Sequence, residues 1–344
     1  MIAIDGVVFS LQRAGGISVY FRTLIDLLYS EQLTAALLLE NPLLQKIEDR
    51  GTNIIAMRRS SRIFERYRAC RLPEDISVFH SSYYRSPARS TVPSVLTVYD
   101  FIYERYRGGP RRWMHSAQKN AAIRAAQSII CISEATKDDL LKYVGETPGQ
   151  SIYVIHCAAS DIFRQVAVAP PPVPYILFVG LRPEYKNFRL ALESMAFLPD
   201  LELHCVGGGP LLQSELEGMP DSVTRRVKHL GFVTDEELNV LYNGAQCLVY
   251  PSSCEGFGIP VLEAMQAGCP VVCTDCKAVL EVGEFALTVV PTIDARLMAD
   301  AILRTASSER ASLIRKGLAV AQGYSWDATH RQTLSVYRSL GAEI

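Results

Sequence analysis

The sequence lacks the features that mark membrane-spanning, secreted or nucleic-acid-binding proteins. No run approaches the ~20 consecutive apolar residues that a membrane-spanning helix needs, and no secretory signal is expected at the N-terminus. The net charge is only −1, and no nucleic-acid-binding motif accompanies it. Tandem repeats and low-complexity tracts are absent as well. The composition that remains, 49% apolar and 21% charged, is typical of a soluble globular enzyme.

A disulfide framework is also unexpected, because the nine cysteines are an odd number. They lie in segments that read as core, such as "SIICIS" and "CLVY", which favours reduced, buried thiols in the cytoplasm. Cys269, Cys273 and Cys276 have the C-x3-C-x2-C spacing of radical enzymes that hold an iron–sulfur cluster. The segment "PVVCT" reads as an interior strand that would separate these thiols, so we predict small buried residues and no metal.

The two halves of the chain differ in charge. Residues 1–165 contain 21 Lys and Arg against 16 Asp and Glu, whereas the remainder contains 14 against 20. Much of the N-terminal excess lies at residues 58–71 and 105–115, where Arg is mixed with aromatic residues. A solvated basic face is the simpler interpretation. Attraction to an anionic membrane or a phosphorylated acceptor is the functional one.

The pattern of apolar residues predicts an α/β protein. At 344 residues the chain exceeds one typical core, so two domains are expected. Short apolar runs alternate with amphipathic stretches, which predicts parallel sheets covered by helices. In the first half we predict strands at "MIAIDG", "ISVFHS", "PSVLTVYD", "SIICIS" and "SIYVIH". In the second half we predict them at "YILFVG", "LELHCVGGGP", "RVKHLGFV", "QCLVYPS" and "CPVVCTD".

A cluster of prolines, "APPPVPY" at residues 169–175, is the strongest linker signal, since prolines stiffen the chain and cannot continue a helix. We therefore predict an N-terminal Rossmann-like domain at residues 1–168 and a C-terminal one at residues 173–325. Two open α/β domains joined in this way would leave a cleft between them. Ligands in such folds bind beyond the carboxyl ends of the strands.

The stretch "YPSSCEGFGIPVLEAMQAG" combines two carboxylates with a flexible turn. We predict a strand before it and a helix over "IPVLEAMQAG", with Pro260 in its first turn and Gly268 at its end. Glu255 then lies in a loop whose glycines let backbone amides approach a ligand at the helix N-terminus. We expect Glu263 in the first helical turn, pointing back toward the same ligand. A plain surface loop feeding a helix is the alternative.

Two further loops follow predicted strands. In "VGLRPEYKN", Arg182 and Lys186 leave a strand end at which a phosphorylated ligand would lie. Two fixed cations can stabilise a departing diphosphate without a metal; a solvated loop is the alternative. In "QRAGGISVY", Gly15 and Gly16 would let a phosphate or an acceptor approach backbone amides, although the dinucleotide-binding G-x-G-x-x-G spacing is absent.

In this order, the motifs resemble those of the retaining glycosyltransferases of family 4, which have the GT-B architecture. The centre of the match is "EGFGIPVLE", the family's E-x7-E pattern, and "GLRPEYKN", "VGGGP" and "HLGFVTDEELNVLYNGA" accompany it. The C-terminal "YSWDATHRQTLSVY" resembles the closing helix, at about residues 326–344, that packs back on the first domain. The match is close over residues 176–337 and looser in the first half.

The resemblance implies transfer of a hexose from a GDP-, UDP- or dTDP-linked donor to a hydroxyl, with the anomeric configuration retained and no cofactor or divalent metal required. By position, Glu263 would hold the ribose, Glu255 the donor sugar, and Arg182 and Lys186 the diphosphate. Loss of either cation is expected to raise the barrier by roughly 3 kcal/mol. The other positions carried over for donor binding are Gly15, Gly16, Phe232, Val233, Gly256, Phe257, Gly258, Ile259, Pro260 and Val261.

One departure from the family pattern concerns the pair that follows "PSVLTV". Many relatives carry His-Asp there, whereas this chain has Tyr99 and Asp100, which we retain as catalytic candidates. Tyr99 can donate a hydrogen bond but does not easily carry a positive charge, and core packing is the equal alternative. The resemblance favours a lipid-linked saccharide acceptor at the inner face of a bacterial membrane. A non-catalytic sugar-nucleotide-binding subunit and an epimerase acting on the sugar nucleotide alone stay open.

Overall fold

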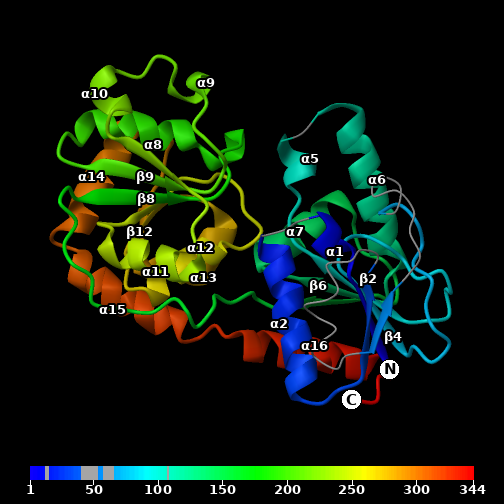
Figure 1. Ribbon diagram of the computed structural model, residues 1–344. Coiled ribbons are helices and arrows are strands. Elements are labelled where there is room, and N and C mark those ends of the chain that lie inside the picture. The colour runs from blue at the N-terminus through cyan, green and yellow to red at the C-terminus, as the bar shows by residue number, and fades with distance from the viewer. Residues whose placement is uncertain (12–14, 40–52, 57–65, 107) are drawn as a thin grey trace. The chain divides into compact units, whose positions relative to one another are not determined.

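The computed structural model describes residues 1–11, 15–39, 53–56, 66–106 and 108–344 (Figure 1). The chain divides into two compact units. The first comprises Met1–Cys157 together with Trp326–Ile344, and the second comprises Ala158–Ser325. Each unit is a parallel sheet covered by helices, so the prediction of two α/β domains with parallel sheets is confirmed.

The sheet of the first unit has the strand order β3-β2-β1-β4-β5-β6-β7, and its strands pair in parallel. The strands are β1 (Ile2–Asp5), β2 (Ala35–Leu39), β3 (Asn53–Ala56), β4 (Val78–Ser81), β5 (Ser94–Val98), β6 (Ser128–Cys131) and β7 (Ser151–Val154). The order reverses between β1 and β4, as it does at the ligand-binding edge of doubly wound folds.

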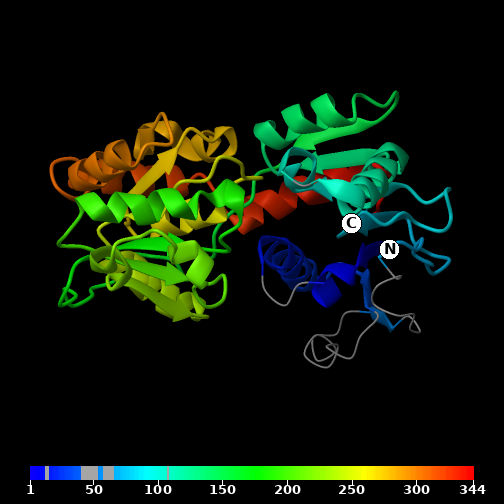
Figure 2. The ribbon, with the colours of Figure 1, turned by 90° about the horizontal axis from the view of Figure 1, so that it is seen from above.

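The helices of the first unit include one from the far end of the chain. They are α1 (Val7–Leu11), α2 (Gly16–Ser30), α5 (Ile102–Tyr106), α6 (Gly109–Ala125), α7 (Glu134–Tyr143) and α16 (Trp326–Ser339). Helix α16 packs on α2, where the Tyr20 hydroxyl lies 3.1 Å from Thr333 Oγ1. Thr23 Oγ1 likewise lies 2.8 Å from His330 Nε2. These buried contacts hold the two chain ends in one unit, and the views agree in placing the termini near each other (Figure 2).

The sheet of the second unit has the strand order β10-β9-β8-β11-β12-β13, again with parallel pairing. The strands are β8 (Tyr175–Val179), β9 (Glu202–Val206), β10 (Val227–Gly231), β11 (Leu248–Tyr250), β12 (Val271–Thr274) and β13 (Leu287–Val290). The order reverses between β8 and β11. In doubly wound folds ligands bind beyond the carboxyl ends of the strands at such a reversal, so the loops after β8 and β11 are where a ligand is expected.

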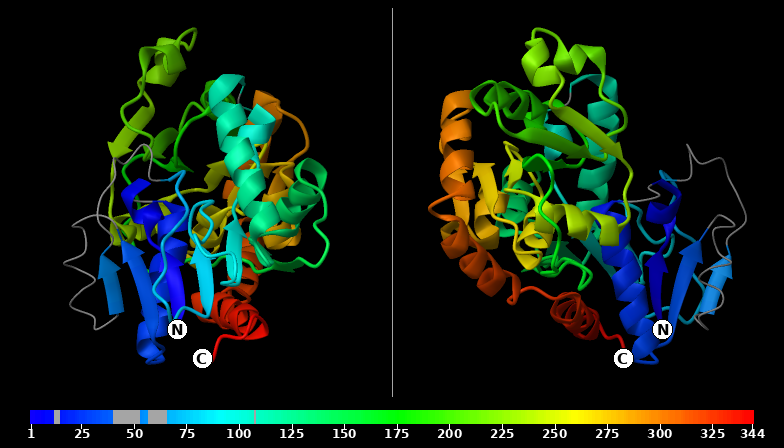
Figure 3. Two further views of the ribbon diagram at one scale, coloured as in Figure 1. Left: turned by 90° about the vertical axis from the view of Figure 1, so that its right-hand side faces the viewer. Right: turned by 60° about the vertical axis from the view of Figure 1, so that its left-hand side comes forward.

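Helices cover the sheet of the second unit and bury its apolar side chains. They are η2 (Glu184–Lys186), α8 (Phe188–Ser194), η3 (Met195–Phe197), α9 (Gln213–Leu216), α10 (Asp221–Thr224), α11 (Asp235–Gly244), α12 (Ile259–Gln266), α13 (Lys277–Gly283), η4 (Glu284–Ala286), α14 (Ala295–Ala306) and α15 (Arg310–Ala321). One core cluster joins the strands to α8 and α14 through residues such as Ile176, Leu192 and Ile302, all completely buried. Figure 3 shows α14 and α15, in orange, lying together beside this sheet.

The predicted strands are confirmed, whereas β2, β3 and β13 were not predicted. The boundary between the units lies earlier than the proline cluster suggests, since residues 158–168 belong to the second unit. Side-chain amides of α11 hold this segment: Asn239 Oδ1 accepts from Arg164 N at 3.0 Å, and Asn243 Oδ1 accepts from Val166 N at 2.8 Å. These tertiary hydrogen bonds leave no mark in local composition.

Candidate functional site

Two of the candidate residues meet where the strand order of the second unit reverses. Lys186 follows β8 and Glu255 follows β11, and the Lys186 ammonium forms an ion pair with the Glu255 carboxylate. The Lys186 Nζ also donates to the Tyr250 hydroxyl at 3.1 Å and lies 4.8 Å from the Tyr250 ring centroid. Both charged side chains are only 11–12% exposed. Charges that are so poorly hydrated interact more strongly with each other and with a charged ligand than they would in water.

The loop that carries Glu255 leads directly into α12, as predicted. Gly258 precedes the helix with a φ of +115°, a left-handed value that suits glycine, and Pro260 lies in the first turn. Phe257 is buried, with its ring centroid 5.8 Å from that of Tyr324. The buried Phe257 anchors the turn between Glu255 and α12, whose first backbone N–H groups are those of Ile259 and Val261, because Pro260 has none.

The position of Glu263 differs from the prediction. Because α12 begins at Ile259, Glu263 lies in the second turn, and the first turn contains no acidic residue. Its Oε2 accepts a hydrogen bond from the Tyr242 hydroxyl at 3.0 Å. Burial raises the pKa of Glu263 to about 7, outweighing the hydrogen bond from Tyr242, which lowers it. The carboxyl group of Glu263 thus gains a proton more readily than an ordinary glutamate does.

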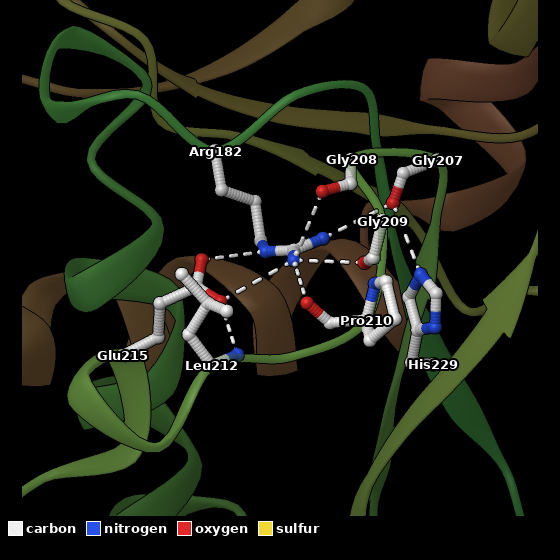
Figure 4. Close-up of polar contacts among 8 residues, drawn as sticks. All are labelled: Arg182, Gly207, Gly208, Gly209, Pro210, Leu212, Glu215 and His229. Carbon is white, nitrogen blue, oxygen red and sulfur yellow. Dashed lines mark hydrogen bonds and ion pairs between the residues drawn. The ribbon is translucent and has the colours of Figure 1, made fainter.

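The surroundings of Arg182 also differ from the expectation of a cation free to meet a diphosphate (Figure 4). Arg182 Nε donates to Glu215 Oε1 at 2.7 Å, and Nη1 donates to the Gly207 carbonyl at 3.0 Å. Nη2 donates to the carbonyls of Gly209 and Pro210 at 2.9 and 3.0 Å. The side chain is only 4% exposed. Its three nitrogens are therefore committed to one carboxylate and to the backbone of residues 207–210, which we call the glycine loop.

Glycine is required in this loop because of its backbone conformation and the nearness of Arg182. Gly207, Gly208 and Gly209 have left-handed φ values of +78°, +76° and +73°. A Cβ at Gly208 would lie 2.5 Å from Arg182 Nη1, closer than any van der Waals contact allows. The loop thus turns its carbonyl oxygens toward the guanidinium. His229, on the neighbouring strand β10, has its Nε2 3.2 Å from the Gly207 carbonyl oxygen.

Glu215 completes the surroundings of Arg182. Its Oε2 accepts from Leu212 N at 2.7 Å while Oε1 accepts from Arg182. Burial alone would raise the pKa of Glu215, but the hydrogen bonds from Arg182 and from the Leu212 amide outweigh it and hold the pKa below its ordinary value. Glu215 is therefore ionised at neutral pH and compensates the charge of Arg182.

Phe232 and Val233, expected to flank a nucleotide base, follow directly after β10. The Phe232 side chain is 85% exposed, and Val233 is half-buried. Thr234 then caps α11, with its hydroxyl accepting from Glu237 N at 3.2 Å. The capped helix fixes the backbone of this pair at the carboxyl edge of the same sheet that carries Lys186.

The candidate residues of the first unit lie in two segments, one at the start of α2 and the other after β5. Gly15 precedes α2 and Gly16 is its first residue, with the Ser18 hydroxyl donating to the Gly15 carbonyl at 2.8 Å. Tyr99 is buried, packs edge-on against the Tyr20 ring at 6.2 Å, and its hydroxyl has no hydrogen-bond partner among the described residues. Burial raises the pKa of Tyr99 well above its ordinary value. Core packing therefore accounts for what Tyr99 contacts.

Asp100 adjoins Tyr99 and stabilises the start of the next helix. Its Oδ1 accepts from Ile102 N, the first residue of α5, at 3.0 Å. The buried Lys119 ammonium donates to the Asp100 carbonyl and to Glu104 Oε2, the latter at 3.1 Å. Asp100 thus belongs to a charged network that fixes the segment after β5.

The cysteine motif does not assemble a cluster site. Cys273 lies within β12, with Cys269 before it and Cys276 after it, and all three thiols are buried and unpaired. Burial raises the pKa of Cys269 and Cys273 to about 12 and that of Cys276 to about 11, which disfavours the thiolates that ligate metals. Among the described residues no group of three or more His, Cys, Asp or Glu is placed to hold a metal ion.

The basic stretches of the first unit are only partly described. Residues 58–65, within the stretch 58–71, and residue 107, within 105–115, lie outside the described residues. Arg105 is paired with Asp139, and Trp113 is 76% exposed. No helix in the described part of the chain is both long and apolar enough to cross a bilayer.

Three residues of the site were not found by sequence reasoning. Tyr250 is the last residue of β11 and contacts Lys186, and Glu215 pairs with Arg182. Asn187, beside Lys186, has a left-handed φ of +48° and donates to the Pro251 carbonyl at 2.7 Å. The only available signal was the type of residue at each position: a tyrosine at a strand end, an acid after a glycine run, and an asparagine before a helix.

Comparison with known families agrees with the division into two units. The family model described as "Glycosyltransferase Family 4" matches residues 14–160, and the model described as "Glycosyl transferases group 1" matches residues 173–308. The O-antigen chain mannosyltransferase B of Escherichia coli is 28% identical over 335 residues, which covers 88% of this chain and 86% of the relative.

Solved structures share the fold over nearly the whole length. Sucrose-phosphate synthase from Thermosynechococcus elongatus superposes with a TM-score of 0.79 at 20% identity, covering 98% of each chain. HepE from Anabaena, solved in complex with UDP-glucose, has a TM-score of 0.71 at 14% identity and covers 98% of this chain and 99% of its own. The chain has the GT-B fold, and the family matches to its two halves support a glycosyltransferase of family 4.

Proposed function

We propose that this protein transfers a hexose from a nucleotide-diphosphate sugar to a hydroxyl of a lipid-linked saccharide during bacterial surface polysaccharide biosynthesis, with retention of the anomeric configuration. The observation that carries the proposal is the Lys186–Glu255 pair at the reversal of strand order in the second unit. A nucleotide is expected at that edge in a doubly wound sheet. The similarity to an O-antigen mannosyltransferase supports a glycan acceptor and makes mannose the first sugar to test.

In this proposal the donor lies across the carboxyl ends of β8 and β11. Lys186 faces the diphosphate, and the backbone N–H groups of residues 256–259 and 261, at the N-terminus of α12, favour its negative charge. Glu255 accepts hydrogen bonds from the sugar hydroxyls and Glu263 from the ribose. The backbone at residues 232–233 meets the base. UDP-glucose bound to the HepE fold supports a nucleotide-sugar donor of this kind.

The reaction proposed here needs a cation at the leaving group rather than a metal. As the bond between the anomeric carbon and the phosphate oxygen breaks, negative charge grows on the diphosphate, and the poorly hydrated Lys186 stabilises it. The acceptor hydroxyl attacks the face from which the diphosphate departs, and a donor phosphate oxygen takes its proton. The resemblance assigns Arg182 to the same diphosphate, but its guanidinium is enclosed, so we propose Lys186 as the direct contact.

The acceptor is proposed to bind the first unit. Gly15 and Gly16 at the start of α2 would let the acceptor approach backbone amides. Asp100 lies in the segment after β5. In this proposal its carboxylate accepts a hydrogen bond from a hydroxyl of the acceptor. The basic character of residues 1–165 supports a peripheral contact with an anionic membrane surface on the cytoplasmic side, where a lipid-linked acceptor is reached.

The test is product formation from purified components. The protein is incubated with GDP-mannose, UDP-glucose or a dTDP-linked hexose and a polyprenyl-diphosphate-linked saccharide, and the product is analysed by mass spectrometry and NMR. The proposal expects an acceptor extended by one hexose with the anomeric configuration of the donor. Nucleotide binding without product would support a non-catalytic subunit, and consumption of the donor without acceptor would support an epimerase. Either result would refute the proposal.

A further inference from the structure

Arg182 and Lys186 lie on one loop, residues 180–187, that connects β8 to α8, and we call it the Lys186 loop. The end of the loop near β8 is held by Arg182, whose guanidinium contacts Glu215 and the glycine loop. Gly180, next to the strand, has a φ of +119°, and its N–H donates to the Val206 carbonyl at 2.9 Å. This end is therefore tied to the segments that follow β9.

The other end of the Lys186 loop is held by Asn187. Its side-chain amide donates to the Pro251 carbonyl at 2.7 Å and to Ser253 Oγ at 2.6 Å. Ser253 N in turn donates to the Tyr185 carbonyl at 2.8 Å. This end is therefore tied to the segment after β11, which carries Glu255.

Lys186 lies between these two attachments. Its backbone N–H donates to the Pro183 carbonyl at 2.9 Å, which closes the single turn of η2. A lysine side chain is long and mobile, so the position of its ammonium depends on where the backbone is held. With residue 182 fixed to the glycine loop and residue 187 fixed to the β11 side, the ammonium of Lys186 is directed at Glu255.

We infer that Arg182 is a positioning residue: together with Glu215 it holds the Lys186 loop, and it acts on the donor through Lys186 rather than by touching the diphosphate. The inference rests on the proposed function of Lys186. Three observations carry it. The Arg182 nitrogens are all engaged, its side chain is 4% exposed, and an added Cβ at Gly208 of the glycine loop would lie 2.5 Å from Arg182 Nη1.

The two possible roles of Arg182 predict opposite effects of removing the charge of Glu215. If Arg182 bound the diphosphate directly, Glu215 would compete with that anion, and Glu215→Gln would tighten nucleotide binding. If Arg182 instead holds the loop, Glu215→Gln loosens Arg182 and weakens binding. The sign of the change thus separates the two roles.

The experiment measures the Kd for GDP, and for UDP and dTDP in parallel, by isothermal titration calorimetry. The inference expects Glu215→Gln and Arg182→Lys each to weaken binding about tenfold, because the Lys186 ammonium is no longer held in place. In a Lys186→Ala background, Glu215→Gln should change the Kd less than twofold, since its effect passes through Lys186. The matched control is Glu193→Gln, which breaks the exposed Arg189–Glu193 pair of α8 and should leave the Kd unchanged. Melting temperatures verify that each variant is folded.

Each outcome decides the question. Unchanged or tighter binding by folded Glu215→Gln would overturn the inference while leaving the proposed function intact. A full tenfold loss that persists without Lys186 would also overturn it, because the glycine loop would then act on the nucleotide independently. If Lys186→Ala binds as tightly as wild type, or if wild type binds none of the three nucleotides, the proposed function fails and the inference falls with it. The binding of wild type and of Lys186→Ala thus distinguishes failure of the proposed function from failure of the inference alone.

Discussion

Arg182 and Lys186 are four positions apart on one loop, yet their surroundings differ in kind. Arg182 is enclosed mainly by backbone carbonyls of the glycine loop and by Glu215. Lys186 contacts two side chains that can themselves exchange partners, the Glu255 carboxylate and the Tyr250 hydroxyl. Backbone carbonyls in a loop of left-handed glycines cannot rearrange without moving the loop. The comparison supports our proposal that Arg182 holds the Lys186 loop and that Lys186 meets the donor.

The largest effect is expected at Lys186. Lys186→Ala removes the proposed contact with the departing diphosphate and should raise the barrier by about 3 kcal/mol, on the order of 100-fold in kcat/KM. Steady-state kinetics with the donor identified by the product assay measures this change. Arg189→Ala, an exposed arginine of α8, is the control and should stay within about twofold. Turnover near that of wild type in Lys186→Ala would contradict the proposal that Lys186, unlike Arg182, contacts the departing diphosphate.

Two neighbouring glycines test how tightly the glycine loop encloses Arg182. Gly208→Ala and Gly209→Ala impose similar backbone strain, because φ is +76° at one position and +73° at the other. Only the Cβ at 208 meets Arg182 Nη1, at 2.5 Å, whereas the Cβ at 209 meets nothing within 4 Å. Gly208→Ala should therefore lower the free energy of unfolding by about 2 kcal/mol more than Gly209→Ala in urea denaturation. Equal losses would mean that Arg182 moves aside freely.

Glu263, for which no cationic partner is found among the described residues, contrasts with Glu255, which is paired with Lys186. Its pKa of about 7 in the folded state lies above the ordinary 4.5, so the folded protein keeps this proton when the unfolded chain has lost it. This contribution to stability is complete below about pH 4.5 and is lost as the pH rises through about 7. The difference in melting temperature between wild type and Glu263→Gln should therefore shift against wild type between pH 5 and pH 8. A constant difference would show that Glu263 is ionised throughout.

The smallest effect is expected at Tyr99, which extends the comparison to the first unit. Tyr99→Phe removes a buried hydroxyl that has no hydrogen-bond partner among the described residues. Because a buried hydroxyl without a partner is costly, the free energy of unfolding should stay the same or rise by about 1 kcal/mol, and kcat/KM should stay within about twofold. A tenfold loss of activity in a variant of unchanged stability would show that the hydroxyl meets the substrate.

The sequence predicted what depends on local pattern and missed what depends on tertiary contacts. Apolar runs such as "YILFVG" and "QCLVYPS" located central strands, and the residues that follow them, Lys186 and Glu255, are indeed brought together. Strand β13 was missed, and the glycine loop gave no sign that it would enclose Arg182. Glu215 lies 33 positions from Arg182, so no spacing rule relates them. The start of α12 at Ile259 was predicted correctly, but Glu263 was placed one turn too early, because it is the fifth residue of the helix and a turn holds only about 3.6 residues.

The most direct test of the account is a crystal structure of the protein with a bound nucleoside diphosphate. We expect a phosphate oxygen within hydrogen-bonding distance of Lys186 Nζ, with the Arg182 guanidinium still bound to Glu215 and to the glycine loop. A diphosphate that contacts the Arg182 guanidinium while Lys186 stays paired with Glu255 alone would contradict it.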